Sequence, residues 1–332
     1  MLETTTLGKT NLVVTRVGLG LAALGRPGYI NLGHARDLNE DYAIEAMRER
    51  AHRVLDVAHD AGVRYYDVAR SYGEGEAFLG SWLRDRRIQS GAMSIGSKWG
   101  YTYTADWKIK AAHHEIKEHS LSVLDRQWAE TKENLGNHLD LYQIHSATFE
   151  SGVLENTAVL SRLAQLKAEG TAIGFTVSGD RQADVIARGL EVCVDGIPLF
   201  DTVQATWNIL ETSASNPLQA AREKGVGVII KEALANGRLT SRNSDPSFEP
   251  KMSVLRQQAE RLECTVDAFA LAAVLAQSWV DVALSGAATV EHLESNVRAA
   301  NVIWDDEANT SIASLKESPE EYWGKRNQLA WN

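Results

Sequence analysis

Cysteine is scarce in the 332-residue chain, which holds only Cys193 and Cys264. Two widely separated thiols give neither a disulfide framework nor the spacing of a metal site, so we expect both to be reduced and no metal to be bound. Long apolar runs are missing as well, and Met1 to Thr15 lacks the apolar core of a signal peptide. The sequence therefore predicts a cytoplasmic protein with no membrane partner.

Basic residues are outnumbered, with 34 lysine and arginine against 44 aspartate and glutamate residues and a net charge of −10. There is no basic stripe or tail, which argues against nucleic acid as a partner. We expect a small-molecule substrate instead. The acidic balance would slow the approach of an anionic substrate unless a local cationic patch compensated for it. Oligomeric state stays open.

Linkers and repeats are missing too. No Pro/Ser-rich stretch or low-complexity tract divides the chain, and 44% apolar residues suffice for a large core. We therefore expect a single domain over residues 1–332.

Eight short apolar runs alternate with longer stretches of helical period. The runs are Arg16–Gly20, Val63–Asp67, Met93–Lys98, Leu139–His145, Ala172–Ser178, Thr202–Trp207, Val226–Lys231 and Val282–Gly286. Strand-then-helix units repeated in this way predict parallel strands joined by crossovers. An open doubly wound sheet is the alternative. The count of eight and the size of the chain favour a closed α/β structure, a (β/α)8 TIM barrel.

Three additions to the barrel are expected. Thr4 to Val14 alternates around Gly8 and predicts an N-terminal β-hairpin cap. Long loops follow the first strand (Leu24–Ala46) and the third (Trp99–Glu115). Between the strands, glycine stops or a leading proline mark helices over Arg48–Ala61, Leu121–Leu135 and Leu154–Ala168, and from Pro217 to near Gly225.

Glycines near the first strand fit the loose dinucleotide pattern G-x-G-x-x-A over Gly18 to Ala23. That pattern requires a helix directly after the glycines. Here Gly25-Arg26-Pro27 follows, which is not the first turn of a helix. We interpret the glycines instead as letting the backbone, at Gly20, pass close to a ligand at the barrel mouth.

Four chemically related side chains fall at or next to strand ends. Asp67 ends the second run and Tyr72 follows in its loop, Lys98 ends the third run, and His145 ends the fourth. In a barrel these positions face one rim. Reduction of a carbonyl needs a proton for the oxygen. An ammonium beside a tyrosine lowers the phenol pKa, a carboxylate holds that ammonium in place, and an imidazole orients the substrate oxygen.

Each of these residues alone has an ordinary explanation. An aspartate at a strand end caps the next helix, a tyrosine packs, a lysine is solvated and a histidine is structural. Four groups whose roles explain one another, at matching positions, favour a catalytic site instead.

Around these residues the chain carries three longer motifs. Asp67-Val68-Ala69-Arg70-Ser71-Tyr72-Gly73-Glu74-Gly75-Glu76, with Leu79-Gly80, is similar to D-T-A-x-x-Y-G-x-x-E-x-x-L-G, except that Val68 replaces Thr. Ser97-Lys98-Trp99-Gly100 is similar to T-K-x-G, and Asp140 to His145 to a histidine-bearing strand. On these motifs, and over nearly its whole length, the chain resembles the aldo-keto reductase superfamily. The resemblance implies a catalytic tetrad of Asp67, Tyr72, Lys98 and His145, and a barrel that binds extended NAD(P)(H).

The same resemblance implies cofactor contacts in later segments. Ser178 and Gln204 would hold the nicotinamide carboxamide, although Gly179 stands where the family usually has Asn. Trp207 would replace the family's Tyr as the ring stacked on nicotinamide, with core packing as the alternative. Lys231 to Leu239 occupies the position of the pyrophosphate loop, where amides from Leu234 to Gly237 would cradle phosphate.

The adenosine end of the cofactor would lie on Ser285 to Asn296, with Ala288, His292 and Asn296 as contacts. Gly286 and His292 stand where many NADP-specific members have a lysine and an arginine, the cations that suit a 2′-phosphate. Some members without them still take NADPH, so we expect NADP(H) to be slightly favoured over NAD(H).

Aromatic residues in the loop after the third strand, Trp99, Tyr101 and Tyr103, suit the walls of a substrate pocket, with loop packing as the alternative. The neighbouring histidines 113, 114 and 119 lie in a polar stretch, Ala111 to Ser120, which we expect to be helical.

The expected function is hydride transfer between NAD(P)(H) and a carbonyl or alcohol substrate, an aldehyde, ketone or sugar, with Tyr72 as general acid/base. One alternative is an NAD(P)+-dependent aldose or polyol dehydrogenase. A second is a cofactor-binding regulatory subunit with little turnover. A third is a barrel with unrelated isomerase or hydrolase chemistry.

Overall fold

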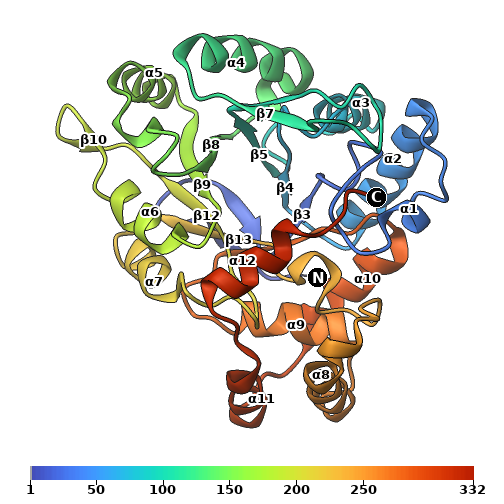
Figure 1. The fold of residues 1–332 in the computed structure, drawn as a ribbon. Coiled ribbons are helices and arrows are strands. Elements are labelled where there is room, and N and C mark those ends of the chain that lie inside the picture. Colours follow the sequence, from blue (N-terminus) through green and yellow to red (C-terminus); the bar gives the residue numbers. More distant parts are fainter. Residues whose placement is uncertain (1) are drawn as a thin grey trace.

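The computed structural model describes residues 2–332, and its strands close into a parallel barrel (Figure 1). In barrel order the strands are β12 (Thr202–Thr206), β13 (Gly227–Lys231), β14 (Val282–Ser285), β3 (Val17–Gly20), β4 (Tyr65–Asp67), β5 (Ser94–Trp99), β8 (Leu141–Ala147) and β9 (Ala172–Val177). Every neighbouring pair is parallel. The predicted (β/α)8 barrel is confirmed, and the open sheet is excluded.

Helices surround the barrel (Figure 1). They are α2 (Ile44–Asp60), α3 (Gly75–Asp85), α4 (Leu121–Leu135), α5 (Thr157–Ala168), α6 (Gln182–Gly189), α7 (Ser215–Glu223), α8 (Glu249–Arg261), α9 (Val266–Leu275), α10 (Val290–Arg298) and α11 (Asp306–Ile312). The helix expected from Leu154 begins at Thr157, because the Asn156 side chain caps it by accepting from the Val159 amide at 3.3 Å. The helix expected from Pro217 begins two residues earlier, since proline is tolerated anywhere in the first turn.

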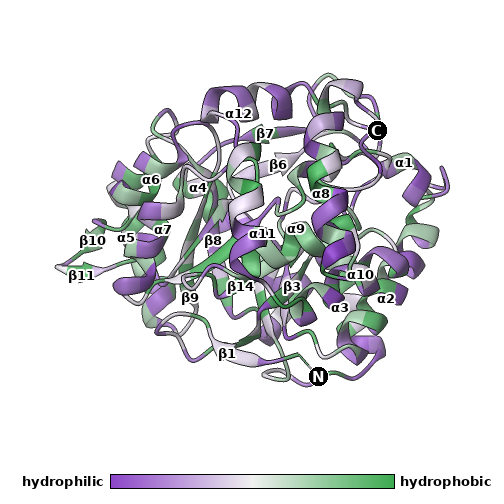
Figure 2. Cartoon of the chain, turned by 90° about the horizontal axis from the view of Figure 1, so that it is seen from below, coloured by the Kyte–Doolittle hydropathy of each residue, from purple (hydrophilic) through white to green (hydrophobic). Residues whose placement is uncertain are grey.

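The predicted hairpin cap closes one end of the barrel. Strands β1 (Thr4–Thr6) and β2 (Val13–Thr15) pair antiparallel. Leu7 and Val14 are fully buried there and pack on Tyr65 and Ile229 from inside the barrel. Figure 2 shows this hairpin at the opposite end of the molecule from α12 (Pro319–Asn327) and the C-terminus. The barrel is therefore plugged at the amino-terminal ends of its strands.

Long loops cover the other end. The loop after β3 carries the short helix α1 (His34–Asp37), and β6 (Tyr101–Tyr103) pairs with β7 (Glu115–Lys117). The helix expected over 111–120 is therefore wrong, since the ladder with β6 draws residues 115–117 into a strand. A further small hairpin joins β10 (Cys193–Val194) to β11 (Ile197–Pro198).

The C-terminal tail folds over this rim. Tyr29 and Asn332 exchange two backbone hydrogen bonds of 3.1 Å, which tie the chain end to the loop after β3. No helix among residues 2–332 is both long and apolar enough to cross a membrane. That residues 1–332 form one domain stays a prediction.

Gly80 tests the packing of α3 on α4. A Cβ at this position would lie 2.2 Å from the Asn134 carbonyl oxygen. We expect Gly80→Ala to lower the free energy of unfolding by about 1–3 kcal/mol, since the overpacked backbone has to shift; urea titration measures this. Gly324 in α12 is the matched control, since a Cβ there meets nothing within 4 Å. Gly324→Ala should stabilise the helix by about 0.5–1 kcal/mol, and similar effects of the two variants would contradict the argument.

Candidate active site

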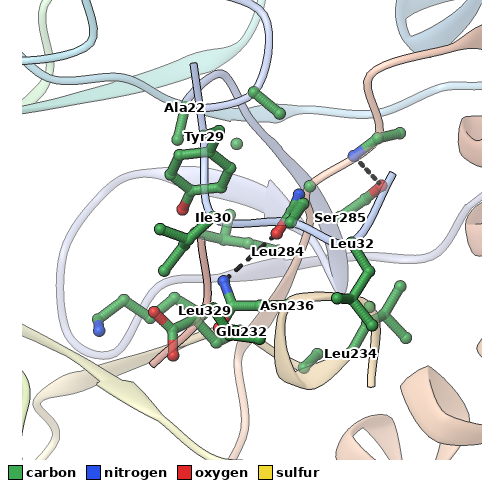
Figure 3. Close-up of a pocket in the computed structure, with 18 of the residues that line it drawn as sticks. Ala22, Tyr29, Ile30, Leu32, Glu232, Leu234, Asn236, Leu284, Ser285 and Leu329 are labelled. Carbon is green, nitrogen blue, oxygen red and sulfur yellow. Dashed lines mark hydrogen bonds between the residues drawn. The ribbon is translucent and has the colours of Figure 1, made fainter. Parts of the chain in front are cut away.

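A cavity of about 540 Å³ opens at the carboxyl ends of the barrel strands. Barrel strands supply much of its wall: Gly20, Asp67, Lys231 and Ser285 end their strands, and His145 and Gln204 lie within theirs. Figure 3 shows Tyr29, Ile30 and Leu32 of the loop after β3 close to Glu232, Leu234 and Asn236, and the two segments are joined by a hydrogen bond of 3.0 Å from the Leu32 amide to the Asn236 carbonyl. A volume of this order is typical of small-molecule sites, and the position is the one that barrel enzymes use.

Asp67 and Lys98 form a buried ion pair inside the barrel. Their side chains are at most 2% exposed, and Lys98 Nζ donates to Asp67 Oδ1 and, at 2.9 Å, to the Val68 carbonyl. The second carboxylate oxygen accepts from Gln204 Nε2 at 2.9 Å and from the Tyr65 hydroxyl at 3.2 Å. A charge removed from water needs such partners, so the pair is held in one geometry.

Tyr72 and His145 complete the predicted group. Lys98 Nζ lies 3.4 Å from Tyr72 Oη, and the rings of Tyr72 and His145 meet edge to face with centroids 5.6 Å apart. Tyr72 and His145 line the cavity along with Asp67, while Lys98 lies behind them. The structure thus brings together the four residues that the strand-end argument selected.

Burial dominates the acid–base properties of Tyr72. Removal from water, reinforced by the Asp67 carboxylate, raises the pKa of Tyr72 well above its usual value, although the Arg26 guanidinium opposes this. The pKa of Tyr72 is therefore raised overall, and the lowering contribution expected from the Lys98 ammonium stays a prediction. The phenol holds its proton at neutral pH.

His145 is neutral for a similar reason. Burial, followed by the charges of Lys98, Lys231 and Arg26, lowers the pKa of His145 well below its usual value. Its Nδ1 is buried and finds no hydrogen-bond partner within residues 2–332. A neutral imidazole carries one N–H, which suits it to donate to a substrate oxygen.

Most of the predicted cofactor contacts share this cavity. Its lining includes Gly20, Ser178, Gln204, Leu234, Gly237, His292 and Asn296. The Asn296 amide and the Ser285 hydroxyl lie 2.8 Å apart at the end of the cavity away from the tetrad. Ala288, 2% exposed, is not part of the lining, whereas its neighbours Gly286 and Ala287 are.

Trp207 lies elsewhere. It is 4% exposed, packs edge-on against Trp279 with ring centroids 5.6 Å apart, and donates from Nε1 to Ser215 Oγ at 2.8 Å. Because the cavity lining does not include it, its expected role as the ring stacked on nicotinamide is corrected to the alternative of core packing.

Of the three aromatic residues proposed for substrate contact, only Tyr101 lines the cavity. Its ring lies edge-on to His145, with centroids 4.9 Å apart. Trp99 is fully buried against His119, and Tyr103 lies further along the β6–β7 hairpin. The expected placement of Trp99 on the pocket wall is therefore wrong, whereas substrate contact by the half-buried Tyr103 stays a prediction.

The segment after β13 is held in an uncommon backbone conformation. Glu232, Ala235 and Asn236 have φ values of 54°, 48° and 55°. Side chains with a Cβ rarely adopt positive φ, and such strain gathers where a loop grips a ligand. Glu232 pairs with Arg326 of α12 at 2.6 Å, so its carboxylate turns toward α12.

Several charged residues of the cavity were missed from the sequence. They are Arg26, Asp37, Lys231, Arg242 and Arg326. Lys231 ends a barrel strand, as Lys98 nearly does, so its position in the sequence indicated a place at the same rim. The others come from the loop after β3, the loop after β13 and α12, where nothing in the sequence shows which side chains turn inward.

Comparison with known proteins agrees with the geometry. A model of the aldo/keto reductase family matches residues 16–317. The NADH-specific methylglyoxal reductase of Escherichia coli is 26% identical over 95% of this chain and 98% of its own. The D-threo-aldose 1-dehydrogenase of a Pseudomonas species is 27% identical over 70% and 72%, and the L-galactose dehydrogenase of Arabidopsis thaliana 24% over 95% and 95%.

Solved structures show the same fold. An aldo-keto reductase from Bacillus halodurans, in its holo form, superposes with a TM-score of 0.74 at 20% identity, covering 96% of this chain and 97% of its own. The family match spans most of the chain and includes every barrel strand. The chain therefore belongs to the aldo/keto reductase family of NAD(P)H-dependent oxidoreductases.

Proposed function

We propose that this protein reduces an aldehyde or ketone, with Tyr72 as the general acid. The observation that carries the proposal is the Tyr72 hydroxyl, which is 3.4 Å from a buried ammonium and borders the cavity beside the His145 ring. A phenol, a charged neighbour and an imidazole in this arrangement supply a proton donor, a means of stabilising its conjugate base and an oxygen-orienting group.

The cavity suits a nicotinamide dinucleotide. The side-chain amides of Gln204 and Asn296 line its two ends, and the strained segment 232–237 lies between them. Asn236 Oδ1 is buried there with no partner among the described residues. When bound, NAD(P)H supplies the hydride that the carbonyl carbon takes up. Gln204, Ser178, the 234–237 segment and Asn296 would hold the cofactor.

The protein side of the reaction follows from the tetrad. His145 donates to the carbonyl oxygen and orients it. As negative charge develops on that oxygen, Tyr72 Oη donates its proton, and the product is an alcohol. The Lys98 ammonium, fixed by Asp67, stabilises the phenolate that remains. The raised pKa of Tyr72 keeps the proton in place until the oxygen needs it.

The tetrad does not set the direction of the reaction, because a catalyst lowers the barrier in both directions: a protonated Tyr72 serves reduction and its phenolate serves oxidation. Burial and the Asp67 charge raise the pKa of Tyr72, so the protonated form is the one present before reduction. One relative is a reductase by name and two are sugar dehydrogenases, so oxidation of an aldose or polyol remains the second candidate. A regulatory subunit with little turnover is the third.

Tyr72→Phe tests the general acid. We expect kcat for carbonyl reduction to fall by about 10²–10⁴-fold, the usual contribution of proton transfer. NADH and NADPH oxidation with a panel of aldehydes measures turnover, and protein fluorescence during cofactor titration measures binding.

Tyr103→Phe removes a hydroxyl from the neighbouring hairpin and is the matched control, expected to keep its activity. Full activity of Tyr72→Phe would remove the proposed acid. A wild-type protein that binds cofactor and reduces none of the panel would favour the regulatory subunit.

Cofactor choice depends on an ion pair near the adenosine end. Arg242 Nη1 donates to Asp37 Oδ2 at 2.7 Å, and a second bond joins Nη2 to Oδ1. Asp37 is 7% exposed, and both residues line the cavity with His292. Burial and the Arg242 charge lower the pKa of His292, so this imidazole is neutral. The guanidinium is already occupied, and a 2′-phosphate would meet the Asp37 carboxylate. We therefore propose NAD(H) as the preferred cofactor, the reverse of the preference expected from the sequence.

Asp37→Asn tests this preference. Freed from its carboxylate, Arg242 can pair with a 2′-phosphate, so we expect the ratio of the Kd for NADPH to that for NADH to fall about tenfold, equivalent to about 1.4 kcal/mol. Fluorescence titration measures both constants. Asp60→Asn, at an 85% exposed position of α2, is the charge-matched control. A ratio that does not change, or a wild-type protein that binds NADPH more tightly, would refute the argument.

A further inference from the structure

The charges around the tetrad do not balance. Three ion pairs lie there: Lys98 with Asp67, Arg26 with Glu115 at 2.9 Å, and Arg326 with Glu232 at 2.6 Å. Lys231 is an additional cation. No carboxylate within residues 2–332 comes within 4.0 Å of its Nζ, which instead donates to Thr206 Oγ1 at 3.0 Å. The tetrad end of the cavity therefore carries an excess positive charge.

Lys231 lies on the cavity wall at the end of β13. Burial lowers the pKa of Lys231 to about 8, a shift that Glu232 partly offsets. Its charge is one of those that lower the pKa of His145, which places it within electrostatic reach of the substrate oxygen site. Lys231 is partly buried, and an ammonium that has lost part of its water and has no carboxylate in contact gains from an anionic ligand.

Arg26 also lines the cavity, and its charge acts on His145 as that of Lys231 does. Its side chain is 3% exposed and lies among the rings of Tyr29, Tyr72 and Trp331, at 5.1, 5.2 and 4.8 Å from their centroids. Nη1 donates to Glu115 and to the Ser71 carbonyl. Nε is buried and finds no acceptor in the described part of the chain. The Arg26 guanidinium therefore brings a positive charge to the cavity wall and has one N–H without an acceptor among the described residues.

We propose that Lys231 and Arg26 form a subsite for a carboxylate of the substrate, so that the enzyme acts on an aldehyde or ketone that is also a carboxylic acid. The inference rests on the proposed function, because the subsite is defined by its position beside Tyr72 and His145. A carboxylate there neutralises the excess charge and takes strong, charge-assisted hydrogen bonds. Lys231 and Arg26 together also form the local cationic patch that an acidic protein needs in order to attract an anionic substrate.

Cofactor phosphate is the competing partner for Lys231. The charges that act on Lys231 include Lys98 and Asp67 of the tetrad, whereas Arg242 and His292 lie together at the adenosine end. This position assigns Lys231 to the substrate. The test separates the two partners.

The test compares kcat/KM for an aldehyde that carries a carboxylate with kcat/KM for its methyl ester. 4-Oxobutanoate and its methyl ester present the same aldehyde with and without the negative charge. We expect wild-type kcat/KM to be at least about tenfold higher for the acid, which is about 1.4 kcal/mol. Lys231→Met should bring the ratio close to one, and Lys231→Arg, which keeps the charge, should restore it. Lys224→Met, at an exposed position of the same sequence region, should leave the ratio unchanged.

The ratio should also depend on pH. Lys231 is charged below its pKa of about 8, so the preference for the acid is full below that pH and falls as the pH rises through it. The charged groups that face Lys231 are Glu232, Arg326, Lys98 and Asp67, with His145 neutral nearby. In Lys231→Arg the preference should persist through pH 9, because a guanidinium stays charged.

Binding of butanoate and butanamide to the protein with NADH, followed by fluorescence, gives a readout without turnover. Tighter binding of butanoate that is lost in Lys231→Met supports the subsite even if no aldehyde is reduced, in which case only the proposed reaction fails. A wild-type ratio near one, a ratio that survives in Lys231→Met, or a Lys231→Met variant that weakens NADH binding alone would overturn the subsite.

Discussion

The buried contact between Lys98 and Asp67 is the constraint on which the rest of the site depends. Both side chains are almost completely removed from water, and each charge is stable there only while the other residue is charged as well. Asp67 satisfies its remaining oxygen with Gln204 and Tyr65, and Lys98 its remaining donors with a carbonyl and Tyr72. These contacts come from separate barrel strands, so closure of the barrel and assembly of the acid–base centre are the same event.

The barrel and the tetrad were predictable because both follow from strand ends. Short apolar runs give the strands, and parallel strands bring their last residues to one rim. Side chains alternate between the two faces of a strand, and this alternation explains why Trp99 and Trp207 do not reach the cavity. Lys98 points into the barrel, so Trp99, the next residue, points to the opposite face, where it is buried against His119. Gln204 and Thr206 likewise share one face of β12, and Trp207 packs outside it.

The remaining cavity wall could not be read from the sequence because it is made by contacts between distant segments. Tyr29 and Asn332 pair through their backbones although they stand 303 residues apart. Arg26 reaches the centre only because its loop folds back over Tyr72, and Asp37 meets Arg242 across 205 residues. These contacts depend on the conformation of the loops and on how the C-terminal tail packs against them. Neither property produces a periodic pattern in the amino-acid sequence.

The charged residues around the cavity connect the cofactor end with the tetrad end. The chain is acidic overall, yet Arg26, Lys231, Arg242 and Arg326 line its cavity and Lys98 lies behind the wall, paired with Asp67. Four of these cations are paired with carboxylates, which lets them be buried without attracting anions indiscriminately. Only where a cation lacks such a partner does an anionic ligand gain a full charge interaction. On the proposed function, this pairing would select between anions: Asp37 would exclude an extra phosphate from the adenosine end, whereas Lys231 would leave the tetrad end open to a carboxylate.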